Sequence, residues 1–138
     1  MSAATSTAAP AIDTCIALAR VQARQALAID DALGRWHGLS LRELDLLRGL
    51  ADAPAQTLPM KALASRLGLT TSDLLRLALP LAKTGLVERA PGTLTLRPGG
   101  ARLAREAMDN AEAAAARTLA ALPADERATL HRLLAALS

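Results

Sequence analysis

The chain has 138 residues, of which 51% are hydrophobic, but it contains no Phe or Tyr and only one Trp. This length fits one domain, and an aliphatic core with few β-branched residues favours packed helices over sheets. A single cysteine excludes an internal disulfide framework and suits a reducing compartment such as the cytoplasm. No apolar run reaches the ~18 residues that a membrane span needs.

The first third of the chain is dominated by one amphipathic pattern. Residues 1–10 lack the basic start and apolar run of a secretory signal, so we expect a flexible tail. From Ala11 to Arg35, apolar residues recur at steps of three, four or their multiples, which predicts a long helix. Its apolar stripe is longer than a small neighbouring domain can cover, so part of it is expected to pack on a partner subunit. Residues 34–38 are expected to break it.

A second helix is expected over residues 41–52. Ser40 stands at its N-cap, and Glu43, three residues later, is in the position that completes a capping box. Residues 53–57 are expected to form a loop that leads into the next element.

Residues 58–77 predict a helix-turn-helix, the element around which the chain is organised. Pro59 suits the first turn of a helix, where its missing N–H is no loss, and Gly68 supplies the left-handed residue that ends it. Polar side chains come next, at the start of the second helix, where they can cap it and face a DNA major groove. These side chains are Thr70, Thr71, Ser72, Asp73 and Arg76.

Pro80 interrupts the continuation of this second helix toward Lys83. A proline in a helix interior removes a backbone donor and clashes with the carbonyl four residues earlier, which costs ~3 kcal/mol or more. We therefore expect a kink or an early end at Pro80.

A hairpin and two helices are expected in the rest of the chain. Residues 86–97 alternate apolar and polar side chains around Pro91-Gly92, which favours a type II turn. The next helix is expected over residues 101–122, and the last begins at Pro123.

Positive charge is concentrated on the helix-turn-helix and the hairpin region after it. Residues 57–105 contain eight basic and two acidic residues, a net charge of +6, whereas the rest of the chain carries −3. A phosphate-contacting surface needs such an asymmetry. An ordinary solvated basic face is the alternative interpretation.

The order of these elements, together with five local motifs, resembles the MarR family of winged-helix transcriptional regulators over residues 12–137. The motifs are HGLSLRELDLLRGLAD from His37, LASRLGLT from Leu63, KTGLVER from Lys83, LRPGG from Leu96 and LPADERATLHRLLAAL from Leu122. The resemblance implies a mainly α fold: a winged helix-turn-helix with long N- and C-terminal dimerisation helices and a small β-hairpin wing. It also implies a homodimer, and often repression that a small ligand or oxidation relieves.

The resemblance divides the chain into dimerisation helices at residues 11–36 and 101–138 and a DNA-binding domain at residues 37–100. The chain departs from the family pattern in its shorter wing, which lacks the usual Asp-Arg pair, in Pro80, and in Arg97, where Thr is common. The residues expected to contact double-stranded DNA are Lys61, Arg66, Thr70, Thr71, Ser72, Arg76, Arg89 and Arg97.

A second class of function stays open: a winged-helix module that has lost specific DNA binding and serves protein interaction or dimerisation. Pro80 is the discriminating feature, because a collapsed second helix would favour that alternative. No enzyme is visible, since the two histidines and the cysteine form no nucleophile and base pair. Neither a cofactor motif nor zinc-ligand spacing is present.

Four further residues have two interpretations each. Arg35, Trp36 and His37 match the place where the family often binds small aromatic acids, but Trp36 could instead plug the core edge with His37 in a turn. Cys15 lies where some family members sense peroxides, but a lone thiol is commonly inert packing.

Overall fold

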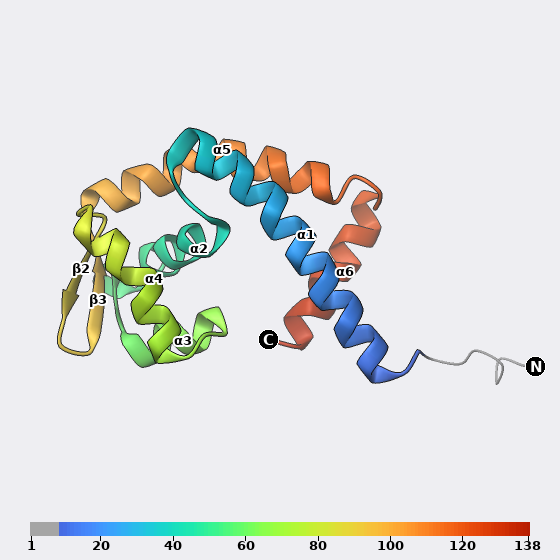
Figure 1. Ribbon diagram of the computed structural model, residues 1–138, viewed down its shortest axis with the longest axis horizontal. Helices are drawn as coiled ribbons and strands as arrows, with labels where there is room; N and C mark the ends of the chain where they lie inside the picture. Colours follow the sequence, from blue (N-terminus) through green and yellow to red (C-terminus); the bar gives the residue numbers. More distant parts are fainter. Residues whose placement is uncertain (1–8) are drawn as a thin grey trace, which may run out of the picture.

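The computed structural model describes residues 9–138, so the predicted tail lies almost wholly outside the described residues. Figure 1 shows a helical molecule with a small sheet at one end. In chain order the elements are α1 (Ala11–His37), α2 (Leu41–Ala51), a short 3-10 turn η2 (Pro54–Gln56), β1 (Thr57–Pro59), α3 (Met60–Leu67), α4 (Thr71–Lys83), β2 (Val87–Ala90), β3 (Thr93–Leu96), α5 (Pro98–Thr118) and α6 (Ala124–Ala136).

The junction between α1 and α2 lies later in the chain than predicted. Gly34 is inside α1, so the expected break there is wrong; a single helical glycine costs only about 1 kcal/mol. The helix ends instead at Gly38, whose φ of 67° is left-handed. The capping box of α2 is confirmed: the Glu43 N–H donates to Ser40 Oγ (3.1 Å), and the Ser40 N–H donates to Glu43 Oε1 (2.8 Å).

The helix-turn-helix is confirmed as α3 and α4. Gly68 ends α3 with a φ of 68°, and the Thr70 hydroxyl caps α4 by accepting from the Asp73 N–H at 3.1 Å. Pro59 precedes α3 rather than lying in its first turn, because it belongs to a strand.

The expected early end of α4 at Pro80 is wrong, since the helix continues to Lys83. Pro80 lies in the last turn with its ring exposed, so the helix loses the single backbone hydrogen bond to the Arg76 carbonyl and has only three further residues to continue. The Thr84 hydroxyl donates to the Pro80 carbonyl at 3.0 Å and so satisfies an acceptor at the helix end.

The wing is the predicted hairpin with one additional strand. β2 and β3 pair around Pro91-Gly92, and Gly92 has the positive φ (72°) that a type II turn requires. Of the loop predicted over residues 53–57, only Thr57 lies in a strand: β1 continues to Pro59 and pairs with β3, giving the strand order β1-β3-β2. Leu58 faces Leu94 in this register, so the sheet gains an apolar pair that the three-residue strand alone did not reveal.

The helix α5 begins at Pro98, three residues before the expected start at Ala101. Pro98 suits the first helical turn, and the next two residues, both glycines, lie inside the helix. At Gly100 an added Cβ would lie 2.2 Å from the carbonyl oxygen of Leu86, so only glycine permits this close approach.

The molecule has two parts with different burial. The first, which we call the lobe, spans α2 to β3 (residues 41–96); its leucines form a core that α5 closes with a row of alanines at 104, 107, 111 and 114. The second, the arm, consists of α6 and residues 11–24 of α1, all of them partly or fully exposed. In Figure 1, α5 runs from the lobe to the arm, where α6 turns back beside α1.

Candidate nucleic-acid interface

The helix α4 buries one face in the lobe and exposes the other. Leu74, Ala78 and Leu81 are buried at helical spacing. The opposite side leaves three of the predicted DNA-contacting residues exposed, namely Thr71, Ser72 and Arg76. A helix held on its apolar side and polar on its free side has the form needed to enter a groove.

Arg76 does not extend freely from this surface. Its Nη2 donates to Asp73 Oδ1, one helical turn earlier, with the two side chains 75% and 46% exposed. The hydrogen bond to Arg76, and then the one to Thr70, lowers the pKa of the Asp73 carboxyl below its usual value. The Asp73 carboxyl is therefore ionised at neutral pH.

The remaining predicted DNA-contacting groups surround α4. The cap residue Thr70 is exposed, as are the four flanking basic residues, which are Lys61, Arg66, Arg89 and Arg97. Two of the arginines contact acidic residues loosely: Arg66 Nη2 lies 3.5 Å from Asp52 Oδ2, and Arg97 Nη1 lies 3.5 Å from Glu88 Oε1. Exposed pairs of this kind contribute little to stability, so a phosphate can displace the carboxylate.

A groove of about 450 Å³ separates α4 from the wing. Arg89 lines it together with Leu75 and the wing turn Pro91-Gly92. The Met60 N–H, at the start of α3, donates to the Gly92 carbonyl at 2.8 Å. This bond ties the tip of the short wing to the helix-turn-helix, so the two form one unit.

The three residues expected to bind an aromatic acid do not close a site in the single chain. Trp36 is 70% exposed, so the alternative in which it plugs the core edge is wrong. Arg35 pairs with Asp31 at 3.2 Å, and His37 lies in the last turn of α1, with its Nε2 2.9 Å from Asn110 Nδ2. The turn position expected for His37 is therefore also wrong.

Cys15 lies on the exposed, N-terminal part of α1 and does not pack into the lobe. Near it, α1 and α6 form an apolar cleft of about 450 Å³. Leu18 and Val21 line it from α1, and Leu130 and Leu134 line it from α6.

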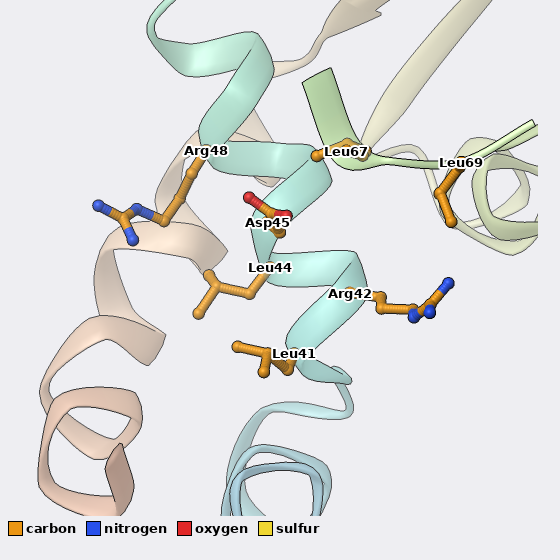
Figure 2. Close-up of a pocket in the computed structure, with 7 residues that line it drawn as sticks. All are labelled: Leu41, Arg42, Leu44, Asp45, Arg48, Leu67 and Leu69. Atoms are coloured by element: carbon orange, nitrogen blue, oxygen red, sulfur yellow. The ribbon is translucent and has the colours of Figure 1, made fainter. Parts of the chain in front are cut away.

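A cavity of about 300 Å³ lies on α2, beside the turn of the helix-turn-helix. Figure 2 shows Asp45 in the middle of its lining, with the guanidinium groups of Arg42 and Arg48 directed to opposite sides. Its apolar lining consists of Leu41, Leu44, Leu67 and Leu69. Since Leu67 and Leu69 flank Gly68, a molecule in this cavity would touch the joint between α3 and α4.

Burial raises the pKa of the Asp45 carboxyl above its usual value, against the opposing charges of Arg48 and Arg66. The sequence-based prediction missed this cavity. The positions 41, 44, 45 and 48 have the i, i+3, i+4, i+7 spacing of one helix face, which is a usable signal. The two leucines that complete the cavity come from a different element, so the spacing alone could not reveal it.

Residues 9–138 show neither a metal site nor a membrane-spanning helix. No group of three or more His, Cys, Asp or Glu side chains is placed to hold a metal ion within this range. No helix in the same described part of the chain is long and apolar enough to cross a membrane.

Solved structures similar to this chain are transcriptional regulators. A MarR family protein of Mycobacterium tuberculosis in complex with salicylic acid is 32% identical, with 94% of this chain and 98% of that chain covered and a TM-score of 0.70. Its complex with DNA matches at 32% identity, with 95% and 99% covered and a TM-score of 0.71. A MarR family regulator from Rhodococcus sp. RHA1 is 26% identical over 95% and 96% of the two chains, with a TM-score of 0.81. Comparisons with models of protein families and with curated proteins found no match.

Proposed function

The chain belongs to the MarR family of transcriptional regulators, and on that basis we propose that it is a homodimeric repressor that binds a specific double-stranded DNA sequence. The observation that carries the proposal is the exposed face of α4, with its hydroxyls and Arg76, surrounded by basic side chains. The similar protein that was solved with DNA supports it. The proposed regulator acts in the cytoplasm and has no catalytic activity.

In this proposal the basic residues have two roles. Arg76 and the hydroxyls of α4 contact base edges in the major groove, where arginine recognises guanine through two parallel hydrogen bonds. The four flanking basic residues hold the phosphate backbone; they are Lys61, Arg66, Arg89 and Arg97. Because the wing tip is tied to Met60, Arg89 reaches phosphate rather than the floor of the minor groove.

The arm supports the proposed dimer, in which residues 11–36 and 101–138 join the subunits and residues 37–100 bind DNA. Large apolar side chains are exposed on both of its helices, more than an isolated small protein leaves uncovered. They include Ile12, Ile16, Leu18, Val21, Leu133, Leu134 and Leu137. A two-fold dimer then presents two α4 helices to half-sites about one helical turn, ~34–36 Å, apart.

The alternative of an interaction module without DNA binding loses its main support. It required a collapsed second helix, whereas α4 is continuous past Pro80. The short wing remains the observation in its favour.

Fluorescence anisotropy on random and genomic-library duplexes, across a salt series, tests the proposal. We expect a steep fall of affinity with salt, and one sequence bound ~10³-fold or more tighter than random DNA. Arg76→Ala should then cost ~1–3 kcal/mol on that sequence. An equal loss on random duplexes would assign Arg76 to phosphate, and weak binding without salt dependence would favour the interaction module.

We also propose that a small aromatic acid modulates the repressor from the cavity on α2. The leucines accommodate an aromatic ring, and Arg42 and Arg48, on either side of Asp45, are the cations that can offset the repulsion between the Asp45 carboxylate and that of a bound acid. The similar protein solved with salicylic acid supports this class of effector.

Release of DNA by salicylate can discriminate the two candidate effector sites, which are the cavity on α2 and residues 35–37. If the cavity on α2 is the site, Arg48→Ala should weaken the release of DNA by salicylate, while the matched change Arg35→Ala leaves it intact. The reverse result would place the site at residues 35–37. Release unaffected by either change would contradict both locations.

A separate comparison of the wild type and Cys15→Ser under mild peroxide tests the redox interpretation of Cys15.

A further inference from the structure

The interface contains a carboxylate where only positive charge would be expected. Asp73 lies on α4 among the side chains proposed to face DNA, three residues before Arg76. Residues at this spacing are neighbours on one face of a helix. Asp73 accepts from Arg76, and its own N–H donates to the Thr70 hydroxyl at 3.1 Å. It is thus held on both sides within the first turn of the helix.

This pair differs from the other two contacts between arginines and acidic residues near the interface. Arg66 on α3 contacts Asp52 at the end of α2, and Arg97 at the start of α5 contacts Glu88 on β2, each at 3.5 Å. Both pairs therefore join different elements. The pair of Asp73 and Arg76 instead lies within α4 alone, with its members three residues apart. Its geometry therefore moves with the recognition helix as one body.

The hydrogen bond from Arg76 to Asp73 has a defined consequence for recognition. Arginine carries five N–H donors in one plane, so donating one to Asp73 leaves others available for a base. Two parallel bonds to guanine form only when that plane is correctly oriented. At the same time a carboxylate close to DNA repels phosphate, whatever the sequence.

We propose that Asp73 is a specificity-determining positioning residue, which orients Arg76 for base recognition and weakens binding to non-cognate DNA through its negative charge. The inference rests on the proposed DNA-binding function. The lowered pKa of Asp73 keeps the carboxylate ionised at neutral pH, so both effects are present under ordinary assay conditions.

The experiment compares the dissociation constants of full-length variants for the selected cognate duplex and a random duplex at fixed salt. Asp73→Ala should tighten binding to random DNA and lower the ratio of cognate to random affinity by roughly tenfold, the effect of losing one oriented base contact. Asp52→Ala is the matched control, because it removes the same charge beside Arg66. It should tighten binding to both duplexes by the same factor and leave the ratio unchanged.

Two further variants separate orientation from repulsion. Asp73→Asn removes the charge but keeps a carbonyl that can accept from Arg76, so it should tighten binding to random DNA and retain part of the ratio. In an Arg76→Ala background, Asp73→Ala should not change the ratio further, since no guanidinium remains to be oriented.

The inference is overturned if Asp73→Ala and Asp52→Ala give the same ratio of cognate to random affinity. It is also overturned if Asp73→Ala lowers this ratio as much in the Arg76→Ala background as in the wild type. Circular dichroism of each variant excludes loss of α4 as the cause. A wild-type protein without a preferred sequence would instead overturn the proposed function, and the inference with it. A wild type that prefers one sequence while Asp73→Ala keeps the full ratio would overturn the inference alone.

Discussion

The lobe and the arm are built from the same types of residue but differ in how far these residues are buried. Leu46, Leu47 and Leu50 in the lobe are inaccessible to solvent, whereas Leu133 on α6 and Leu137 at its C-cap are exposed. Both parts are helical and rich in Leu and Ala, so helix propensity does not separate them. The difference is that the lobe finds its apolar partners within the chain. The arm exposes the same kind of surface, which has a function only if another subunit covers it.

The largest effect should come from placing a charge in the cleft of the arm. Leu134→Glu would place a carboxylate against Leu18 and Val21 in a cleft that Arg127 also lines. Burying this charge under a partner subunit is unfavourable even beside an arginine, because both charges lose water. Light scattering after gel filtration should show half the wild-type mass, and cognate DNA binding should fall with it. The control for subunit mass, though not for DNA binding, is Leu79→Glu, because Leu79 on α4 is similarly exposed (37%, against 41% for Leu134). A dimeric Leu134→Glu variant would contradict the proposed interface.

A change in the lobe should instead reduce folding stability. In Gly100→Ala the new methyl group meets the backbone carbonyl of Leu86, which no side-chain rotation can relieve. We expect a loss of about 3 kcal/mol in the free energy of unfolding, measured by urea denaturation. Gly99→Ala is the control, since its nearest neighbour would be 3.9 Å away, and it should be close to neutral. A neutral or stabilised Gly100→Ala variant would contradict the close approach, because replacing a helical glycine by alanine otherwise stabilises the helix by roughly 1 kcal/mol.

A smaller effect is expected at the start of α2. Ser40→Ala removes the hydroxyl that accepts from the Glu43 N–H, and a lost N-cap costs ~0.5–2 kcal/mol. Ser65→Ala, at an exposed position on α3, should change the urea midpoint much less. A neutral Ser40→Ala variant would mean that packing alone holds the start of α2.

The smallest effect, and one that depends on pH, concerns Asp45. Burial raises its pKa above the unfolded value of 3.8, so the folded chain binds this proton more tightly than the unfolded chain. The ionised carboxylate therefore lowers stability above the raised pKa, and this penalty disappears below pH 3.8, where both states are protonated. Asp45→Asn should raise the melting temperature at pH 7, by an amount that shrinks as the pH falls toward 4. An increase that is constant with pH would assign the gain to packing.

The parts predicted from the sequence are those governed by local chemistry. The Ser40 cap, the left-handed Gly68 and the Pro91-Gly92 turn each depend on a few adjacent residues, and all three are confirmed. The family resemblance, which combines such signals over the chain, is also confirmed. The roles of individual DNA-contacting residues stay predictions.

The errors arise where distant segments decide the structure. β1 exists because it pairs with β3, nearly forty residues away, and its three residues carry no strand pattern of their own. The helix α5 includes Gly100, one residue before its expected start, and the close approach of Leu86 that requires a glycine there depends on a segment fourteen residues earlier. The effect of Pro80 is smaller than predicted because its cost depends on its place in the helix. The cavity at Asp45 likewise requires leucines from two elements.

The joint between α1 and α2 has a consequence for the evolution of the DNA sequences that such a dimer binds. Asp30, which interrupts the apolar stripe of α1, accepts the Leu41 N–H at 2.7 Å, while Leu39 between the helices is buried. With Gly38 in a left-handed conformation, these contacts set the angle at which each lobe leaves the arm. In a two-fold dimer that angle determines the distance between the recognition helices. Substitutions at this joint could therefore change the spacing of the half-sites during evolution, while every side chain that contacts a base stays the same.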